Sequence, residues 1–120
     1  MKLISVVTYC YNEQTNVEPL CEEIRSIFKK YSNKYDYEHI FIDNNSSDST
    51  VQTLRKIAAR DTRVKLIVCA RNFGSIRSSY YALFQAKGDA VVHMAADFQE
   101  PPELIHNFIE EWEKGAKVVV

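Results

Sequence analysis

The sequence predicts an α/β fold in which helices cover both faces of a mainly parallel β-sheet. Short apolar runs rich in β-branched residues alternate along the chain with segments whose apolar residues recur at helical spacing. Runs of the first kind indicate buried strands. Buried strands separated by helices require right-handed crossovers, and therefore parallel pairing.

Five strands are expected, over Leu3–Thr8, Tyr37–Ile42, Val64–Cys69, Ala90–Met94 and Lys117–Val120. Helical spacing between them is marked by Val17, Leu20, Cys21, Ile24 and Phe28, by Val51, Leu54 and Ile57, by Tyr80, Leu83 and Phe84, and by Leu104, Ile105, Phe108, Ile109 and Trp112. Ser49 followed by Gln52 fits a capping box, and Gly88 and Gly115 stand where helices should stop. No polar tail follows the last strand, so we expect an N-terminal fragment of a longer protein.

The composition is that of an ordinary globular protein. A chain of 120 residues fits one domain that buries about 65% of its unfolded surface. The formal net charge of −1 gives no basic excess, so nucleic acid is not an expected partner. No apolar run approaches the roughly 20 residues of a membrane span. The three cysteines (Cys10, Cys21, Cys69) and three histidines (His39, His93, His106) lack metal-ligand spacing, so we expect reduced thiols and structural histidines.

Three predicted loops collect polar residues, and each follows a strand. They span Tyr9 to Glu13, Asp43 to Asp48, and Ala95 to Glu100. Ligands of open parallel sheets bind outside the carboxyl ends of the strands, so these loops should form the binding edge. The last loop leads into Pro101 and Pro102, and proline is tolerated in the first turn of a helix. An acidic turn held between a strand and a helix could position a divalent cation and a phosphate.

Each loop has both a local and a functional interpretation. For Asp43 and Asn44 ligand contact is as well supported as turn formation, whereas Ser46–Asp48 fit helix capping. Tyr11 could stack on a base or fill a gap, and Glu13 could approach a ribose or favour a helix start. Arg71 follows the third strand and suits a phosphate, while Arg77 is interpreted as a solvated side chain. No nucleophile with an adjacent base stands out.

Taken in order, these segments resemble the motifs of family-two glycosyltransferases, closest to the group that contains bactoprenol glucosyltransferase and dolichol-phosphate mannose synthase. The matching segments are Ser5–Glu13, Asp43–Thr50, Arg71–Gly74, Gly88 with Asp89, and Asp97–Glu103. The resemblance implies that residues 1–120 are the Rossmann-like, nucleotide-sugar-binding half of a GT-A fold. It also implies an inverting hexose transfer and a Mg²⁺ or Mn²⁺ cofactor.

The resemblance assigns residues to roles. Tyr9, Tyr11, Glu13, Ile42 and Asn44 fall where relatives grip the nucleoside, and Asp97 and Gln99 fall where relatives hold the metal. With Asp43 and Arg71, these make up the expected site. Relatives place the general base beyond this segment, so we expect residues 1–120 alone to be inactive. The acceptor would be a polyprenyl phosphate or a cell-surface glycan. We expect a cytoplasmic location, at the cytoplasmic face of the membrane if regions outside this segment provide an anchor, and homo-oligomerisation stays open.

Three departures from the family pattern matter. Ala95 stands where relatives carry the first acid of the metal turn, Tyr9 where they tend to have proline, and Asn44–Asn45 where they have aspartate and glycine. Uracil presents an acceptor, a donor and an acceptor along one edge, which an asparagine amide can meet, whereas guanine's two adjacent donors suit a carboxylate. Asn44 therefore favours a UDP-sugar donor.

Other classes fit less well. A phosphoacceptor receiver module would need an acidic pair after the first strand, where this chain has Thr8, Tyr9 and Cys10. A nucleotidyltransferase would need a glycine-rich basic loop at that point. A non-catalytic sugar-nucleotide-binding domain is compatible with Ala95 in place of the first acid.

Overall fold

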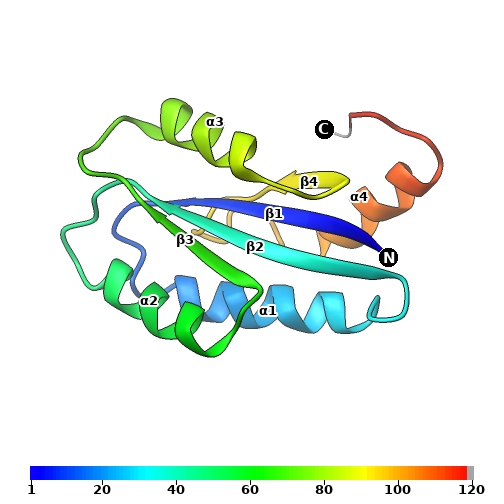
Figure 1. Ribbon diagram of the computed structural model, residues 1–120, viewed down its shortest axis with the longest axis horizontal. Coiled ribbons are helices and arrows are strands. Elements are labelled where there is room, and N and C mark those ends of the chain that lie inside the picture. Colours follow the sequence, from blue (N-terminus) through cyan, green and yellow to red (C-terminus); the bar gives the residue numbers. More distant parts are fainter. Residues whose placement is uncertain (119–120) are drawn as a thin grey trace.

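The computed structural model describes residues 1–118 and confirms the α/β fold class. The strands are β1 (Lys2–Cys10), β2 (Tyr35–Asp43), β3 (Val64–Val68) and β4 (Ala90–His93), and the helices are α1 (Val17–Lys29), α2 (Thr50–Arg60), α3 (Ser75–Gln85) and α4 (Leu104–Glu113). The strands form one parallel sheet in the order β3-β2-β1-β4. Strand and helix alternate throughout, as the apolar pattern predicts (Figure 1).

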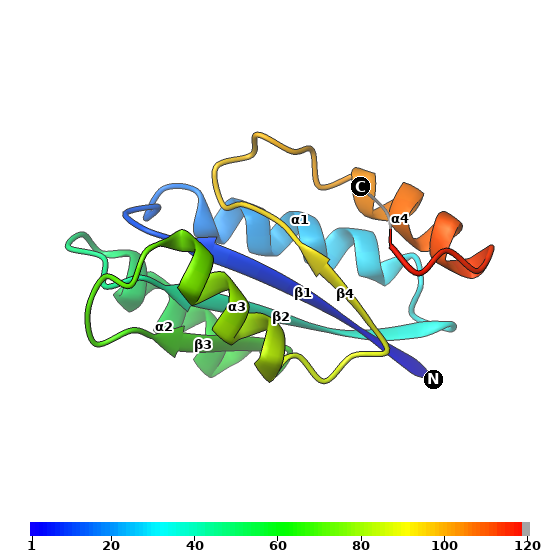
Figure 2. The same ribbon diagram turned by 90° about the horizontal axis from the view of Figure 1, so that it is seen from above.

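Helices cover the two faces of this sheet unequally. The larger core cluster joins α1, α2 and α4 to one face through residues such as Leu20, Leu54 and Ile105. The smaller cluster lies under α3 and consists of Val7, Ile40, Ile42 and Ala82. Figures 1 and 2 show α3 alone on its side of the sheet. The expected helices on both faces are therefore present, and α3 is the only described helix on the second face.

The predicted fifth strand does not form in the described part of the chain. Lys117 lies in a bend and Val118 in an irregular segment, and the other two residues of that prediction, Val119 and Val120, lie outside the described residues. Within residues 1–118, β4 is therefore an edge strand, as is β3.

The sequence predicts three residues at helix boundaries. Gly115 is confirmed in this role, whereas Gly88 and Ser49 act differently. Gly115 follows α4 with a φ of +102°, the left-handed conformation that glycine adopts at helix ends. Gly88 does not end α3, which stops at Gln85. Gly88 instead packs so closely against β1 that a Cβ atom would lie 2.6 Å from the Ser5 Oγ. Ser49 precedes α2, but its side chain makes no capping hydrogen bond, so the predicted capping box is absent.

Candidate functional site

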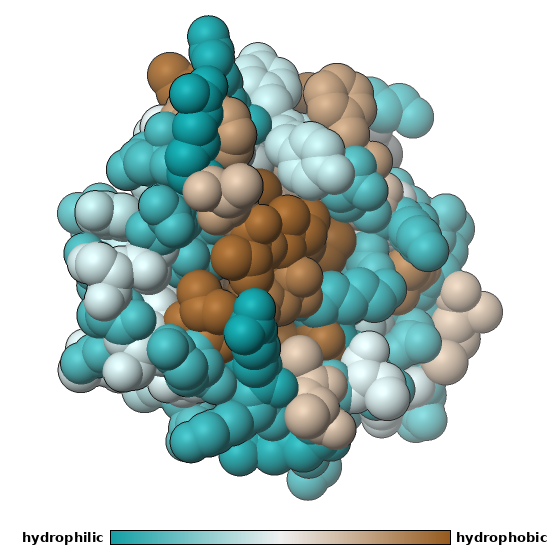
Figure 3. All heavy atoms as spheres, turned by 60° about the vertical axis from the view of Figure 1, so that its left-hand side comes forward, coloured by the Kyte–Doolittle hydropathy of each residue, from teal (hydrophilic) through white to brown (hydrophobic). Residues whose placement is uncertain are grey.

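The strand register brings the predicted loops to one edge of the sheet. Cys10 at the end of β1 pairs with Asp43 at the end of β2, and Asp43 pairs with Val68 at the end of β3. β4 ends slightly earlier, at His93 opposite Val7, and the Met94 amide continues the pairing by donating to the Val7 carbonyl. The four following loops therefore share an edge, here called the rim. Figure 3 shows the molecule from this side, with a hydrophobic area in the middle of a largely hydrophilic face.

The loops after β1 and β2 are joined by hydrogen bonds. Asn12, in the left-handed region with a φ of 54°, accepts through its side-chain oxygen from the backbone amides of Ser47 and Asp48, at 2.9 and 3.4 Å. The Glu13 amide donates to the Thr50 hydroxyl at 2.9 Å, and the Gln14 side chain accepts from the Ser49 amide at 2.8 Å. Each loop therefore supplies acceptors for backbone donors of the other, and these bonds tie the two loops together.

Asp43 is fully buried and organises the start of the second loop. One carboxylate oxygen accepts from the Ser46 amide at 2.8 Å and the other from the Ser46 hydroxyl. This is the local hydrogen-bonding pattern of an aspartate turn. Burial raises the pKa of the neighbouring Cys10 thiol far above its usual value, and the charge of Asp43 adds to the effect, so Cys10 stays protonated. Asp48 accepts from the Thr50 amide at 3.0 Å, which confirms its predicted capping role.

Asn44 is buried and lies at the centre of a hydrogen-bond network. Its side-chain nitrogen donates to the Tyr9 hydroxyl at 3.1 Å and to the Asn72 oxygen at 2.6 Å. Its side-chain oxygen accepts from the Phe73 amide at 2.9 Å and from the Ser78 hydroxyl at 3.0 Å. The residue is 0% exposed, and all four hydrogen-bonding positions of the amide are used within the protein. Asn44 thus ties β1, the loop after β3 and α3 together.

The loop after β3 presents an exposed cation. The Arg71 guanidinium lies 4.8 Å from the centre of the Phe73 ring, a cation–π contact, and the residue is exposed, so an anion in solvent can reach it. Gly74 follows with a φ of +83°, and α3 begins at the next residue. The turn that re-aims the chain into α3 therefore needs glycine.

The acidic turn after β4 is open to solvent. Asp97 is exposed, and its carboxylate accepts a hydrogen bond from the backbone amide of Gln99 at 3.2 Å. Phe98, between the two, has a φ of +62°. No cluster of three or more His, Cys, Asp or Glu side chains is arranged to hold a metal ion within residues 1–118. One carboxylate with one amide nearby fits a Mg²⁺ or Mn²⁺ ion that takes most of its ligands from phosphate oxygens and water.

The other expected nucleotide-binding residues differ in exposure. Tyr11 is 41% exposed and Glu13 is half-buried, with its carboxylate accepting from the Asn16 amide group at 2.8 Å. Tyr9 is half-buried against the cluster under α3, and Ile42 is fully buried within that cluster. Tyr11 and Glu13 are thus accessible to a ligand, whereas Ile42 is not.

Sequence reasoning missed the residues that support this site. Asn72 and Ser78 complete the network around Asn44, and Asn12 and Gln14 join the first two loops. The one signal for Asn12 was its position beside Tyr11 and Glu13 in the first polar loop. Nothing in the local pattern separates Ser78 from a surface serine of a helix.

Each of the three histidines lies within hydrogen-bonding distance of a hydroxyl group. His39 is completely buried, its Nε2 lies 2.9 Å from the Thr8 hydroxyl, and its Nδ1 has no partner in the described part of the chain. Burial lowers the pKa of His39 to about 3, so its ring is neutral. His106 meets the Tyr31 hydroxyl at 2.7 Å, and His93 lies 3.2 Å from the Ser79 hydroxyl.

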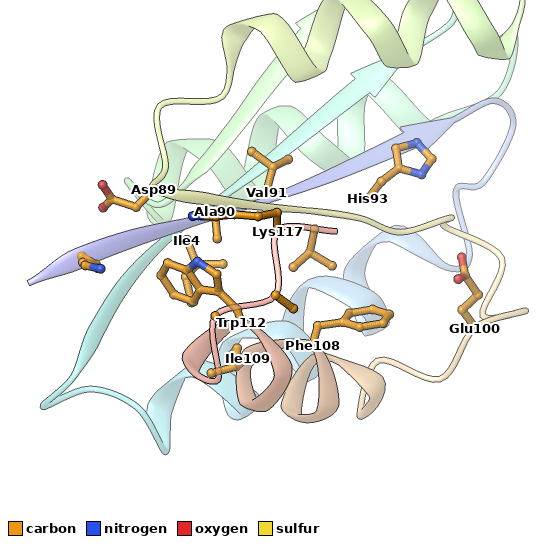
Figure 4. A pocket seen from close by; sticks show the side chains of 14 residues that line it. Ile4, Asp89, Ala90, Val91, His93, Glu100, Phe108, Ile109, Trp112 and Lys117 are labelled. Atoms are coloured by element: carbon orange, nitrogen blue, oxygen red, sulfur yellow. The ribbon is translucent and has the colours of Figure 1, made fainter. Parts of the chain in front are cut away.

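A groove lies at the β4 edge of the sheet, away from most of the rim. It runs between β4 and α4 with a volume of about 880 Å³, and Trp112, Phe108 and Val91 line it (Figure 4). Of its lining residues only Glu100 comes from a rim loop. The groove follows the free edge of β4.

No described helix is long and apolar enough to cross a membrane.

Comparisons with known proteins agree with this architecture. A family model for glycosyl transferase family 2 matches residues 5–120. CsbB of Bacillus subtilis (strain 168), whose name includes the word glycosyltransferase, is 38% identical over 98% of this chain and 35% of its own length. Bactoprenol glucosyl transferase of Shigella phage SfV is 32% identical over 98% of this chain and 38% of its own length. The chain thus spans little more than a third of these relatives.

Solved structures of similar fold include a mannosyltransferase, PcManGT from Pyrobaculum calidifontis, in complex with GDP-Man and Mn²⁺. It has a TM-score of 0.66 at 26% identity over 89% of this chain and 31% of its own. S. aureus TarS 1-349 has a TM-score of 0.68 at 26% identity over 92% of this chain and 33% of its own.

Proposed function

Since the chain belongs to glycosyl transferase family 2, we propose that this protein transfers a hexose from a nucleoside diphosphate sugar to a polyprenyl phosphate or another cell-envelope glycan acceptor. The observation that carries the proposal is the match of the family model over residues 5–120, together with the four loops that meet at one rim. The rim offers an aromatic ring, a guanidinium and a carboxylate, which suit a base, a diphosphate and a metal-bridged phosphate.

We assign direct contact with the donor to the residues of the expected site that solvent reaches. These are Tyr11, Glu13, Arg71 and Asp97. Of the buried members, Ile42 packs in the apolar cluster under α3, and Asp43 holds the second loop through Ser46. Asn44 joins β1 to the loop after β3, and its amide would meet a base only by exchanging one of its protein partners. Tyr9 belongs to both groups, since its hydroxyl supports Asn44 while its ring is half-buried.

Asp97 and Gln99 are the residues that would hold a divalent cation. Such an ion would neutralise the charge of the leaving diphosphate as the glycosidic bond breaks. The Mn²⁺ named for the mannosyltransferase of similar fold supports this assignment, although Ala95 removes the first acid of the usual pair. With a single carboxylate, the protein would depend on phosphate oxygens to complete the ligand set.

The metal assignment is tested by isothermal titration of the protein with UDP and GDP, each with Mn²⁺ and with EDTA. Asp97→Ala should abolish the gain in affinity that Mn²⁺ gives, while the matched control Glu103→Gln, an exposed acid near the same turn, should keep it. Unchanged Mn²⁺-dependent affinity in Asp97→Ala would remove Asp97 from the site.

The nucleotide is proposed to be UDP. The sequence favours it through direct reading of uracil by the Asn44 amide, which would require Asn44 to exchange a partner such as Asn72 for the base. The same titrations decide the point, because tighter binding of GDP than of UDP would reject it.

The acceptor is proposed from two relatives. Bactoprenol glucosyl transferase is one, and an undecaprenyl-phosphate 4-deoxy-4-formamido-L-arabinose transferase of Pseudomonas fluorescens, 33% identical, is the other. A polyprenyl phosphate acceptor implies work at the cytoplasmic face of a membrane. Transfer of labelled hexose to undecaprenyl phosphate in detergent tests it directly.

A non-catalytic sugar-nucleotide-binding role is the second candidate, because Ala95 replaces the first acid. Such a protein would bind the donor without hydrolysing it or transferring its sugar. Slow donor hydrolysis in the absence of acceptor would therefore favour the enzyme.

A further inference from the structure

Helix α3 carries large apolar side chains on its outer surface. Ile76, Tyr80 and Phe84 are 73%, 60% and 82% exposed. Residues four apart lie above one another on a helix, so these three form a continuous stripe along α3. Tyr81 beside them is 55% exposed, and Phe73 just before the helix is 39% exposed.

The inner surface of α3 shows that the fold does not need this stripe. Ser78 and Ala82, both small, are the fully buried residues of the helix and face the sheet. The usual pattern of a surface helix, with large apolar residues inside and polar residues outside, is therefore inverted. An exposed apolar patch of this kind marks an interaction surface.

The charge around the stripe is of one sign. From Thr62 to Gly88 the chain has five basic residues and no acidic one. Arg63 and Lys65 pair with Asp36 and Glu38 on β2. The other three, Arg71, Arg77 and Lys87, take part in no ion pair found within residues 1–118, and they lie before, within and after α3.

We propose that the outer face of α3 docks on an anionic lipid membrane. Aromatic and aliphatic side chains flanked by unpaired cations are the combination by which an amphipathic helix lies in a membrane interface. Within residues 1–118, no other helix lies beyond α3 on that side of the sheet (Figure 1). The proposal extends the proposed function, because a polyprenyl phosphate acceptor would lie in such a membrane, but it concerns binding and not transfer.

Self-association through this face is disfavoured by its charge. A two-fold contact would bring the same patch of two copies together, so Arg71, Arg77 and Lys87 of each copy would meet those of the other. Like charges across an interface oppose association. An anionic surface satisfies the cations and the apolar stripe together.

The test is co-sedimentation of the protein with vesicles of phosphatidylcholine alone or with 30% phosphatidylglycerol. We expect binding only to the anionic vesicles, and weaker binding as salt increases. Arg77→Glu should weaken binding at least about tenfold, since it removes one cation and adds one anion near the surface, and each such charge contributes about 1 kcal/mol. The matched control Arg55→Glu, on the exposed side of α2, should bind as the unmodified protein does.

The apolar stripe is tested with Ile76→Ser combined with Phe84→Ser, and with a reporter. The double variant should lose vesicle binding while keeping its thermal midpoint, because both side chains are exposed. The tryptophan introduced by Tyr80→Trp should shift its emission to the blue on anionic vesicles and be quenched by brominated lipid, whereas Trp112, on the α4 side of the sheet, should not.

Three outcomes would overturn the proposal. In the first, Arg77→Glu and Arg55→Glu bind vesicles equally well. In the second, vesicles do not change the emission of the Tyr80→Trp variant. In the third, the double variant changes its oligomeric mass but still binds vesicles. Nucleotide titrations on the same samples keep this result separate from the proposed function, because a protein that binds donor but no vesicles refutes only the membrane contact.

Discussion

Acid should destabilise this protein through one buried side chain, His39. Its ring lies in the interior of the sheet face covered by α1, α2 and α4, 4.0 Å from the Phe41 ring between centroids. Burial lowers the pKa of His39 from an ordinary value of 6.5 to about 3 in the folded state. Between these pH values only the unfolded chain takes up the proton, so protons favour unfolding.

The size of the effect follows from the two pKa values. Above pH 6.5 the ring is neutral in both states, so His39 makes the free energy of unfolding independent of pH. Each pH unit below 6.5 then costs about 1.4 kcal/mol, which amounts to about 2 kcal/mol at pH 5. The loss continues until the folded state also binds the proton, near pH 3.

Urea denaturation at pH 7.5 and pH 5 measures this cost against His39→Gln, which keeps a polar group near Thr8 but does not titrate. Unmodified protein should lose about 2 kcal/mol more than the variant between the two pH values. His93→Gln, which removes an exposed histidine, is the control and should behave as the unmodified protein. Parallel losses in unmodified protein and His39→Gln would refute the reasoning.

Three further changes test the fold and the site. Asn44→Asp removes the donors to Tyr9 and Asn72 and places a charge beside the Asn72 oxygen. The free energy of unfolding, measured by thermal denaturation, should therefore fall by about 1–3 kcal/mol. An unchanged midpoint would show that the network is dispensable. Gly88→Ala places a methyl group 2.6 Å from the Ser5 hydroxyl and 2.7 Å from its backbone nitrogen, and overpacking of this kind costs about 1–3 kcal/mol in the same assay. Residues 1–120 alone should give no sugar transfer in a radiolabel assay, and any turnover would locate the general base within them.

The two central strands were predictable because they are buried over most of their length on both faces. β1 and β2 read as apolar runs over most of their length, and the intervening helices have clear spacing. The boundaries were less predictable, since β2 begins at Tyr35 rather than Tyr37 and so includes the charged residue Asp36, whose carboxylate pairs with Arg63. A charge that tertiary contacts satisfy leaves no mark in the local pattern.

The roles of single residues were predictable only where they depend on near neighbours. Asp48 caps α2 through residues close by in the sequence, and Gly115 ends α4 by its own backbone freedom. Gly88 looks like a helix stop in sequence, but it is needed for close approach to Ser5, 83 residues away. The partners of Asn44 are likewise 28 to 35 residues distant, so its amide could not be known to be occupied.

The hydrogen bonds that join the first two loops also constrain evolution. The side-chain oxygen of Asn12 takes the place of water as the hydrogen-bond acceptor for the backbone amides of Ser47 and Asp48. It does so from a left-handed backbone conformation that few residue types adopt. The donors are backbone amides, which every residue except proline carries, so the constraint falls on position 12 and not on the side chains opposite. In an alignment of relatives, position 12 should therefore favour residues that tolerate a left-handed backbone and offer an oxygen acceptor, and proline should be avoided at positions 47 and 48.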